Sequence, residues 1–382
     1  MEENKNKNRQ IARKKALGIL LPLIFGGILG FLIGVLGANV TNKGNQGLNI
    51  NILYFFISIV IGLYVQIIIH EFGHFIFGLL SGYQLVSFRV GSFTLVRTPE
   101  GMKIKRYNIP GTGGQCLMAP PKQESNGKYP MKLYNMGGIL FNLIVSILCT
   151  IVYVISRNIA FKMVCLGFML VGYYLFIVNG IPLKIGGIAN DGYNVFSSGD
   201  KDPIGQRAFY IQLDINARLS NGIQMNDIPF EDIALPEDAN LSNPLVTGAK
   251  ILEYYWYMNR NELENAKNLL EQILATDKVI PLMRNMVKME RVFVEILTEN
   301  KQSIIDDMWT KDVQRYIKQA KYDIHARRVE VAMAMREDRQ STKTKNAKEK
   351  YKKIEKNCPV IGELMLSNKL LRVLEETYQI KN

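Results

Sequence analysis

Residues 52–80 read ILYFFISIVIGLYVQIIIHEFGHFIFGLL, an apolar run that contains one cluster of ionisable side chains. From Asn45 to Phe88 the only formally charged residue is Glu71. A helix of about 20 apolar residues is long enough to cross roughly 30 Å of hydrocarbon. Ionisable groups inside such a span are costly and usually serve a function. This stretch therefore predicts a transmembrane helix that carries a functional site.

The ionisable cluster is an HExxH motif, His70-Glu71-Phe72-Gly73-His74. Positions i and i+4 of a helix share a face, so both imidazoles can bind one Zn²⁺. Glu71 is then placed to deprotonate a metal-bound water, as in metal-assisted hydrolysis. The alternative is a helix kink or a water pocket that holds these residues without metal. Because the chain has only three histidines, two at this spacing beside a glutamate favour the metal site.

Outward from this helix the chain divides into an apolar region and a more charged region. Of its 382 residues, 48% are hydrophobic and the mean hydropathy is +0.01, which excludes a disordered or collagen-like chain. Four transmembrane helices are predicted, over residues 16–40, 49–80, 133–156 and 163–183. The first apolar run is too long for a cleaved signal peptide and is expected to remain as an anchor.

Charge indicates the orientation of these spans. The formal net charge of +13 would suggest a nucleic-acid partner for a soluble protein, but six of the basic residues precede the first span and the loop 41–47 holds only Lys43. The positive-inside rule therefore predicts cytoplasmic N- and C-termini in a multi-pass membrane protein, with no nucleic acid bound. The four cysteines include no CxxC pair, so neither a disulfide framework nor a cysteine metal site is indicated.

The fold class expected is an α-helical multi-pass membrane protein with a small β-hairpin insert, followed by an all-α cytoplasmic domain. Alternation of apolar and polar residues over Gln84–Arg97 predicts a strand or hairpin, and residues 108–121 are rich in turn formers. The strand-like segment is a candidate for holding an unwound substrate by edge pairing, with a purely structural hairpin as the alternative. The domains predicted are a basic N-terminus (1–15), a membrane core (16–195) with a β-rich insert (84–121), a linker (196–244) and a helical domain (245–382).

The helical domain carries a weak internal repeat. Asn265-Ala266-Lys267 recurs 81 residues later as Asn346-Ala347-Lys348, a separation of about two units of 40 residues, as in TPR-like helical repeats. An irregular helical bundle is the alternative. The charged segment 336–356 is expected to be a solvated helix face that could also touch anionic lipid heads. A protein is the expected partner of this domain.

A catalytic zinc usually takes three protein ligands, so one ligand remains to be found. The third histidine, His325, lies in a charged stretch and is expected to be a solvated helical residue. Asp191 follows the fourth span closely, after a helix-breaking segment at 179–182. With a cytoplasmic N-terminus, spans two and four both run inward, so Asp191 is expected at the depth of the HExxH motif.

Span three starts from the same side of the membrane. Its first turns contain Gly137 and Gly138, which permit close helix approach, and Asn142. Asn142 is a candidate to hydrogen-bond a substrate carbonyl or the tetrahedral intermediate. A buried asparagine that ties helices together is the alternative.

Residues 50–192 resemble the site-2 protease family of intramembrane zinc metalloproteases. The resemblance rests on the HExxH motif, the Gly-Gly-Ile-Leu-Phe-Asn run that ends at Asn142, and the break at 179–182 that leads to Asp191-Gly192. It implies that Asp191 is the third zinc ligand and Glu71 the catalytic base. Two departures stand out: the segment before the aspartate is lengthened by residues 184–187, and Asn190 stands where the family has leucine. No PDZ or CBS domain is recognisable.

The function predicted is a zinc-dependent intramembrane endopeptidase, with one Zn²⁺ per chain held by His70, His74 and Asp191. It would cleave transmembrane or signal-peptide-like segments of membrane proteins or peptide precursors near the cytoplasmic side of the bilayer. Two alternatives stay open. One is a membrane zinc peptidase whose third ligand is a glutamate, and the other is a non-proteolytic membrane adaptor that uses its helical domain.

Overall fold

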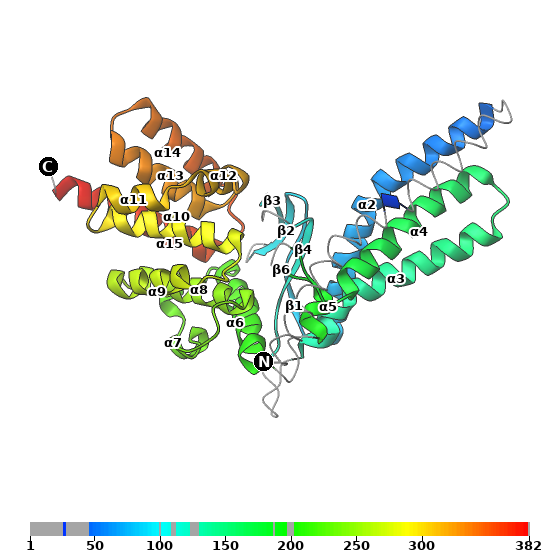
Figure 1. Cartoon of the computed structure of the whole chain (residues 1–382), viewed down its shortest axis with the longest axis horizontal. Helices are drawn as coiled ribbons and strands as arrows, with labels where there is room; N and C mark the ends of the chain where they lie inside the picture. The colour runs from blue at the N-terminus through cyan, green and yellow to red at the C-terminus, as the bar shows by residue number, and fades with distance from the viewer. Residues whose placement is uncertain are drawn as a thin grey trace, which may run out of the picture. The chain divides into compact units, whose positions relative to one another are not determined.

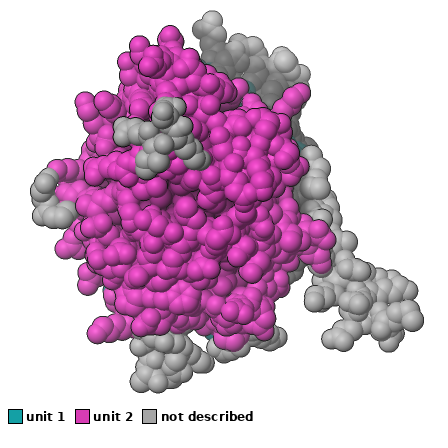
Figure 2. Space-filling model, turned by 90° about the vertical axis from the view of Figure 1, so that its left-hand side faces the viewer, with its two compact units in different colours: residues 1–81, 130–201 teal, residues 82–129, 202–382 magenta. Residues whose placement is uncertain are grey.

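The computed structural model describes residues 26–27, 46–98, 101–107, 112–122, 130–185, 188–196 and 202–380. Over these residues the protein is mostly helical and has a small antiparallel sheet, which agrees with the helical content and the β insert of the fold class expected (Figure 1). The chain forms two compact units. Residues 1–81 and 130–201 make the first, and residues 82–129 and 202–382 make the second, whose surface Figure 2 shows in magenta.

The first unit is built on three long apolar helices that pack side by side, α2 (Gln46–Leu80), α3 (Met131–Ile155) and α4 (Ile159–Gly180) (Figure 1). Each is long and apolar enough to cross a membrane. They correspond to the spans predicted at 49–80, 133–156 and 163–183, although α4 begins and ends a few residues earlier. The span predicted at 16–40 lies outside the described residues, apart from positions 26 and 27.

These helices turn apolar side chains outward and polar side chains inward. Val60 and Ile155 are 62% and 71% exposed, whereas Gln66, Asn142 and Ser146 have no exposed surface. In water both the exposed apolar side chains and the buried polar side chains would be unfavourable. Lipid reverses the preference, because it solvates the apolar surface and leaves the polar groups to bond one another inside the bundle. The surface of α2, α3 and α4 therefore suits a bilayer.

The backbones of α2 and α3 touch at the level of the HExxH motif. A Cβ atom on Gly73 would lie 2.3 Å from the carbonyl oxygen of Gly137, and a Cβ on Gly137 would lie 2.3 Å from that of Gly73. Only glycine at both positions allows this approach. It brings α3 directly against the face of α2 that carries the two histidines.

The second unit begins with a four-stranded antiparallel sheet in the order β3-β2-β1-β4. Its strands are β1 (Gln84–Val90), β2 (Phe93–Thr98), β3 (Gly101–Arg106) and β4 (Gly114–Ala119). The strands predicted within 84–97 are thus confirmed. Residues 108–121, predicted as turns, contain β4, because the glycines and prolines there flank a short apolar run instead of interrupting it.

The register of the sheet contradicts the idea that residues 84–97 pair with a substrate edge to edge. β1 pairs with both β2 and β4, and β2 pairs with both β1 and β3. The backbone groups of both strands are therefore used within the sheet, and its edges are β3 and β4. The local alternation of the sequence did not reveal that β3 and β4 flank this hairpin.

The rest of the second unit is helical, and it begins inside the segment predicted as a linker. Ile211, Ile215 and Leu219 recur every four residues in the first of these helices and are at most 1% exposed, so this part of the predicted linker contributes to the core. The short two-stranded pair β5 (Lys184–Ile185) and β6 (Ile188–Ala189), with α5 (Asp191–Phe196), belongs to the first unit. The helices of the second unit are α6 (Pro203–Ser220), η1 (Met225–Asp227), α7 (Phe230–Ile233), α8 (Pro244–Asn259), α9 (Leu263–Ala275), α10 (Pro281–Leu297), α11 (Gln302–Met308), α12 (Lys311–Gln319), α13 (Ile324–Glu337), α14 (Thr342–Glu355) and α15 (Ile361–Ile380).

The two repeated Asn-Ala-Lys segments lie in equivalent surroundings. Residues 265–267 are in α9, which packs on α8, and residues 346–348 are in α14, which packs on α13. Both helix pairs also neighbour α10, through α8 and α9 on one side and α13 on the other. This arrangement is compatible with stacked helical hairpins, and the TPR-like assignment stays a prediction.

A buried polar cluster joins α8, α10 and α13. The carboxylate of Glu290 pairs with Arg328 and accepts hydrogen bonds from the hydroxyls of Tyr254 (2.8 Å) and Tyr255 (3.1 Å). His325, expected to be solvated, is 3% exposed, and its ring stacks on Tyr255 at 4.3 Å between centroids. That expectation was wrong because Arg328, a charged neighbour of His325 in the sequence, pairs with Glu290 in the interior and does not face solvent. Burial, with the guanidinium nearby, lowers the pKa of His325 well below its ordinary value.

Candidate metal centre

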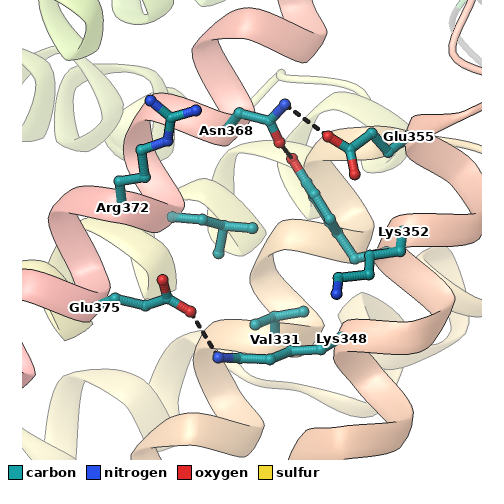
Figure 3. Close-up of a pocket in the computed structure, with 9 residues that line it drawn as sticks. Val331, Lys348, Lys352, Glu355, Asn368, Arg372 and Glu375 are labelled. Atoms are coloured by element: carbon teal, nitrogen blue, oxygen red, sulfur yellow. Dashed lines mark hydrogen bonds and ion pairs between the residues drawn. The ribbon is translucent and has the colours of Figure 1, made fainter.

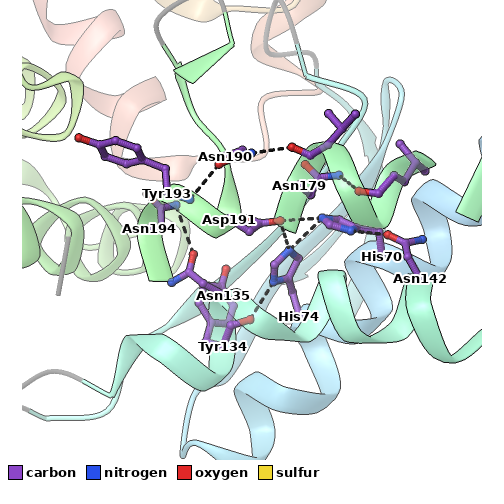
Figure 4. Close-up of polar contacts among 12 residues, drawn as sticks. His70, His74, Tyr134, Asn135, Asn142, Asn179, Asn190, Asp191, Tyr193 and Asn194 are labelled. Carbon is purple, nitrogen blue, oxygen red and sulfur yellow. Dashed lines mark hydrogen bonds and ion pairs between the residues drawn. The ribbon is translucent and has the colours of Figure 1, made fainter. Parts of the chain in front are cut away.

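The two histidines of the HExxH motif lie one helical turn apart on the face of α2 that meets α3. Their side chains are buried, with 9% of His70 and 7% of His74 exposed. The Nε2 atoms of the two rings are 3.2 Å apart, and the ring planes are inclined by 84°. Figure 4 shows both imidazoles turned toward the same point.

Asp191 completes this arrangement from the first turn of α5. Its Oδ2 atom lies 2.9 Å from Nε2 of His70 and 3.3 Å from Nε2 of His74 (Figure 4). Among the described residues these three side chains form the cluster suited to a metal ion. The structure thus brings together the ligands predicted from the sequence, although 116 residues separate His74 from Asp191.

The spacing of the three donor atoms fits zinc. Around a tetrahedral ion with bonds of about 2.0–2.1 Å, ligand atoms lie roughly 3.3–3.4 Å apart. The observed separations of 2.9, 3.2 and 3.3 Å need only a small expansion to reach this geometry. Two imidazole nitrogens and one carboxylate oxygen are also a donor set that zinc accepts, with a fourth position left for water or substrate.

The hydrogen bonds of the rings leave the inward nitrogens free to bind metal. Nδ1 of His70 lies 2.7 Å from Oδ1 of Asn142, and Nδ1 of His74 lies 2.8 Å from the carbonyl oxygen of Tyr134. Both partners are acceptors, so each Nδ1 carries a proton, and in the neutral ring Nε2 then keeps its lone pair for a metal. This outer layer of acceptors fixes the tautomer and the ring orientation, as is usual for metal-binding histidines.

Gly138 of α3 makes room beside the ligand atoms. A Cβ atom there would lie 2.6 Å from Nε2 of both histidines and 2.5 Å from Cε1 of His70. Such distances are well inside van der Waals contact, so any side chain at this position would displace the imidazoles. The space that glycine leaves is therefore at the point where the donor atoms converge.

Glu71 is buried in α2 next to His70, with 7% of its surface exposed. A buried carboxylate in an apolar helix is costly unless it has a partner or a task. Its position in the sequence places it one residue from a ligand, which is compatible with the role of base predicted for it.

The side chain of Asn142 makes hydrogen bonds within the bundle. It has no exposed surface, and its Nδ2 donates to the backbone carbonyl of Gln66 (3.0 Å) and to the side-chain oxygen of the same residue (2.8 Å). Its Oδ1 accepts from His70. Of the two interpretations of this asparagine, the geometry favours the one that ties helices together, with the orientation of His70 as its consequence.

Sequence reasoning missed Gln66, which supports Asn142. Its own amide donates to the carbonyl of Phe168 in α4 at 3.2 Å, so that it joins α2, α3 and α4 one turn before His70. A lone amide in an apolar helix was the available signal. The carbonyl of Tyr134 gave no signal, because every residue has one. His325 belongs to the second unit and takes no part in this cluster.

Three apolar helices around an HExxH motif, completed by an aspartate from a later element, define the class of membrane-embedded metalloproteases. The chain matches the model of peptidase family M50 over residues 58–365, and it belongs to that family, the site-2 proteases. The match extends over most of the chain, well beyond residues 50–192 on which the resemblance rested. No curated protein and no solved structure matches the chain.

Proposed function

We propose that this protein is a zinc-dependent intramembrane endopeptidase that cleaves transmembrane or signal-peptide-like segments near the cytoplasmic side of the membrane. The observation that carries the proposal is the convergence of two imidazole nitrogens and one carboxylate oxygen within 3.3 Å of one another, inside a bundle of apolar helices. His70, His74 and Asp191 would hold one zinc ion per chain.

Bound zinc would supply a Lewis acid for the scissile carbonyl and a lower pKa for the attacking water. Glu71 accepts the proton of that water and delivers it to the leaving amine. The buried setting of Glu71 strengthens its interaction with charge that develops beside it. A substrate helix hides its carbonyl in a hydrogen bond to the residue four positions on, so it must unwind locally before attack.

The predicted orientation supports cleavage near the cytoplasmic side. With the basic N-terminus inside, α2 runs from the outer to the cytoplasmic face. His74 lies six residues before the end of α2 at Leu80, which is about 9 Å along the helix axis. This depth is within the cytoplasmic third of a hydrocarbon layer roughly 30 Å thick. The C-terminal helices then lie in the cytoplasm.

The experiment that tests the function compares metal content and cleavage in four detergent-purified forms. We expect about one zinc per chain in the wild type and in Glu71→Gln, and loss of zinc in His70→Ala and Asp191→Ala. Glu71→Gln should retain the metal and accumulate uncleaved membrane precursors in cells. Absence of zinc from the wild type would refute the proposal.

The same variants separate the alternatives. A peptidase with a glutamate as third ligand predicts that Asp191→Ala keeps its zinc. A non-proteolytic adaptor predicts that Glu71→Gln cells show no precursor that the wild type processes. The cluster that could hold a metal ion among the described residues contains Asp191 and no glutamate, which supports the aspartate over a glutamate as third ligand.

We also propose that the helical unit binds an acidic segment of a protein partner in a groove between α13, α14 and α15 (Figure 3). Lys348 on its wall pairs with Glu375 at 2.6 Å, whereas Lys352 and Arg372 have no ion-pair partner among the described side chains. Val331 supplies an apolar floor. The lining also contains Glu355, so three basic side chains face two carboxylates and the groove keeps a net positive charge. A groove of about 250 Å³ with this excess of basic groups suits an acidic peptide with an apolar anchor.

A labelled peptide of alternating glutamate and leucine is a direct probe of this groove. Binding at low salt should weaken at least tenfold when Lys352→Glu and Arg372→Glu are combined. Lys350→Glu with Lys353→Glu makes the same change in net charge on exposed residues outside the groove and should have little effect. Equal loss in both double variants would refute the groove as the binding site. Binding to anionic phosphatidylglycerol vesicles without binding to the peptide would replace the protein partner with lipid.

A further inference from the structure

Between the end of α4 and Asp191 the chain forms the strand pair β5 and β6 and then comes back to the end of α4. β5 and β6 pair antiparallel, with Lys184 opposite Ala189 and Ile185 opposite Ile188. At the base of this hairpin, the backbone N–H of Asn190 donates to the carbonyl of Leu183 at 3.1 Å. Lys184 and Ile185 thus leave the end of α4 as one strand, Ile188 and Ala189 return as the other, and Asp191 follows directly after the chain has returned to the end of α4.

The side chain of Asn190 joins the three elements that meet at this point. Its Nδ2 donates to the carbonyls of Val178 (2.6 Å) and Ile181 (2.7 Å), which lie at the end of α4. Its Oδ1 accepts from the N–H of Leu183 at the hairpin base (3.1 Å) and from the N–H of Tyr193 in α5 (2.8 Å). Carbonyls at the end of a helix and N–H groups at the start of the next lack partners within their helices. One amide therefore satisfies groups of both helices (Figure 4).

The ligand-bearing helix depends on such external support. α5 has six residues, and a helix of this length is not stable by itself in isolation. Asn190 caps it, and the second residue of α5 packs against the end of α4, where a Cβ on Gly192 would lie 2.3 Å from the carbonyl oxygen of Gly180. Asp191, which carries the carboxylate, lies between Asn190 and Gly192, the two residues that these contacts hold in place.

We propose that Asn190 is a positioning residue that holds Asp191 at the distance the metal requires. This inference rests on the proposed function, since it concerns a ligand of the same centre. It gives one explanation for both departures from the family noted in the sequence, the lengthened segment and Asn190. The N–H of Leu183 at the base of the hairpin and the carbonyls at the end of α4 all bond to the side chain of Asn190, and a leucine in its place could satisfy none of them. The asparagine therefore suits the lengthened segment that precedes it.

Metal affinity is the property that a positioning residue changes. Loss of a group that orients a ligand typically weakens binding ten- to a hundredfold. We expect that loss for Asn190→Ala and Asn190→Leu, measured as zinc affinity by chelator competition in the full-length protein in detergent. Asn190→Ser keeps an oxygen that can accept from Tyr193 and should fall between these variants and the wild type. The visible spectrum of the cobalt-loaded protein should change in the same order.

Asn158→Ala is the matched control. Asn158 caps the opposite end of α4, where its Oδ1 accepts from the N–H of Phe161 at 3.1 Å. Both alanine variants remove an asparagine cap and should lower the melting temperature of the metal-free protein, but only Asn190→Ala should weaken zinc binding. Equal zinc affinity of Asn190→Ala and the wild type would overturn the inference and leave the proposed function standing. A wild type that binds no zinc would overturn both.

Discussion

Replacement of Asn142 by leucine tests whether the interior of the membrane bundle sets the affinity of the metal centre. Leucine has the same number and branching of side-chain heavy atoms as asparagine and suits the apolar surroundings, so the helices should still assemble. The change removes the acceptor that lies 2.7 Å from Nδ1 of His70. The N–H of that ring then stays buried without a partner, which costs about 1–3 kcal/mol. The ring regains a partner only by turning, which moves Nε2 away from Asp191.

This cost converts directly into affinity. Since every 1.4 kcal/mol is about tenfold, a loss of 1–3 kcal/mol weakens zinc binding by roughly 5- to 150-fold. The assay is chelator competition on the purified full-length protein, with Ser58→Ala as the control. Ser58 is also buried in α2, about three helical turns before His70, and donates to the carbonyls of Phe55 (2.7 Å) and Met163 (3.4 Å). Unchanged zinc affinity in Asn142→Leu would refute the orienting role. Equal weakening in the control would show that loss of bundle stability, and not ring orientation, is responsible.

Three further predictions concern packing, pH and buried charge. Gly138→Ala places a Cβ within 2.6 Å of both ligand nitrogens and should abolish zinc binding, and retention of one zinc per chain would contradict this geometry. Burial beside Asp323 raises the pKa of Glu363 from 4.5 to about 8, so this carboxyl is protonated in the folded protein over a range where it is ionised when unfolded. The contribution of Glu363 to stability is complete below about pH 4.5 and is lost as the pH rises through about 8. Glu363→Gln should therefore flatten the decline in melting temperature between pH 5 and 8. If the decline is unchanged in this variant, other groups cause it. Glu290→Gln leaves the guanidinium of Arg328 buried without a counter-ion and should lower the free energy of unfolding by about 3–5 kcal/mol in urea titration, and a loss below about 1 kcal/mol would show that the ion pair is not a net requirement of the fold.

Much of the membrane unit followed from the sequence because bilayers impose simple rules. Length and hydropathy are enough to identify α2, α3 and α4, since a spanning helix must satisfy its own backbone and cover about 30 Å. The HExxH spacing identified two ligands because a helix has a fixed period. Asp191 came from a resemblance and from its place after a helix break, and the structure supplied the distances of 2.9 and 3.3 Å to the histidines.

The second unit was harder to predict, because water permits many arrangements of the same pattern. His325 and Arg328 look like a solvated helix face in the sequence, yet each is at most 3% exposed because Tyr255 and Glu290 from other helices meet them in the interior. β4 was hidden in a stretch rich in glycine and proline, since its pairing with β1 comes from a residue pattern 30 positions earlier. Local periodicity contains no information about such long-range partners.

By itself the sequence determined the membrane class, the two histidine ligands and the carboxylate beside them, because these depend on local composition and on the 3.6-residue period of a helix. Only the tertiary structure decided what holds those ligands in place. Asn142 of α3 accepts from His70, and Gln66, one turn earlier in α2, holds Asn142. Asn190 joins α4 to α5 at the base of the β5–β6 pair. Hydrogen bonds between distant segments form only when the whole bundle brings donor and acceptor within about 3 Å, so no spacing in the sequence could reveal them.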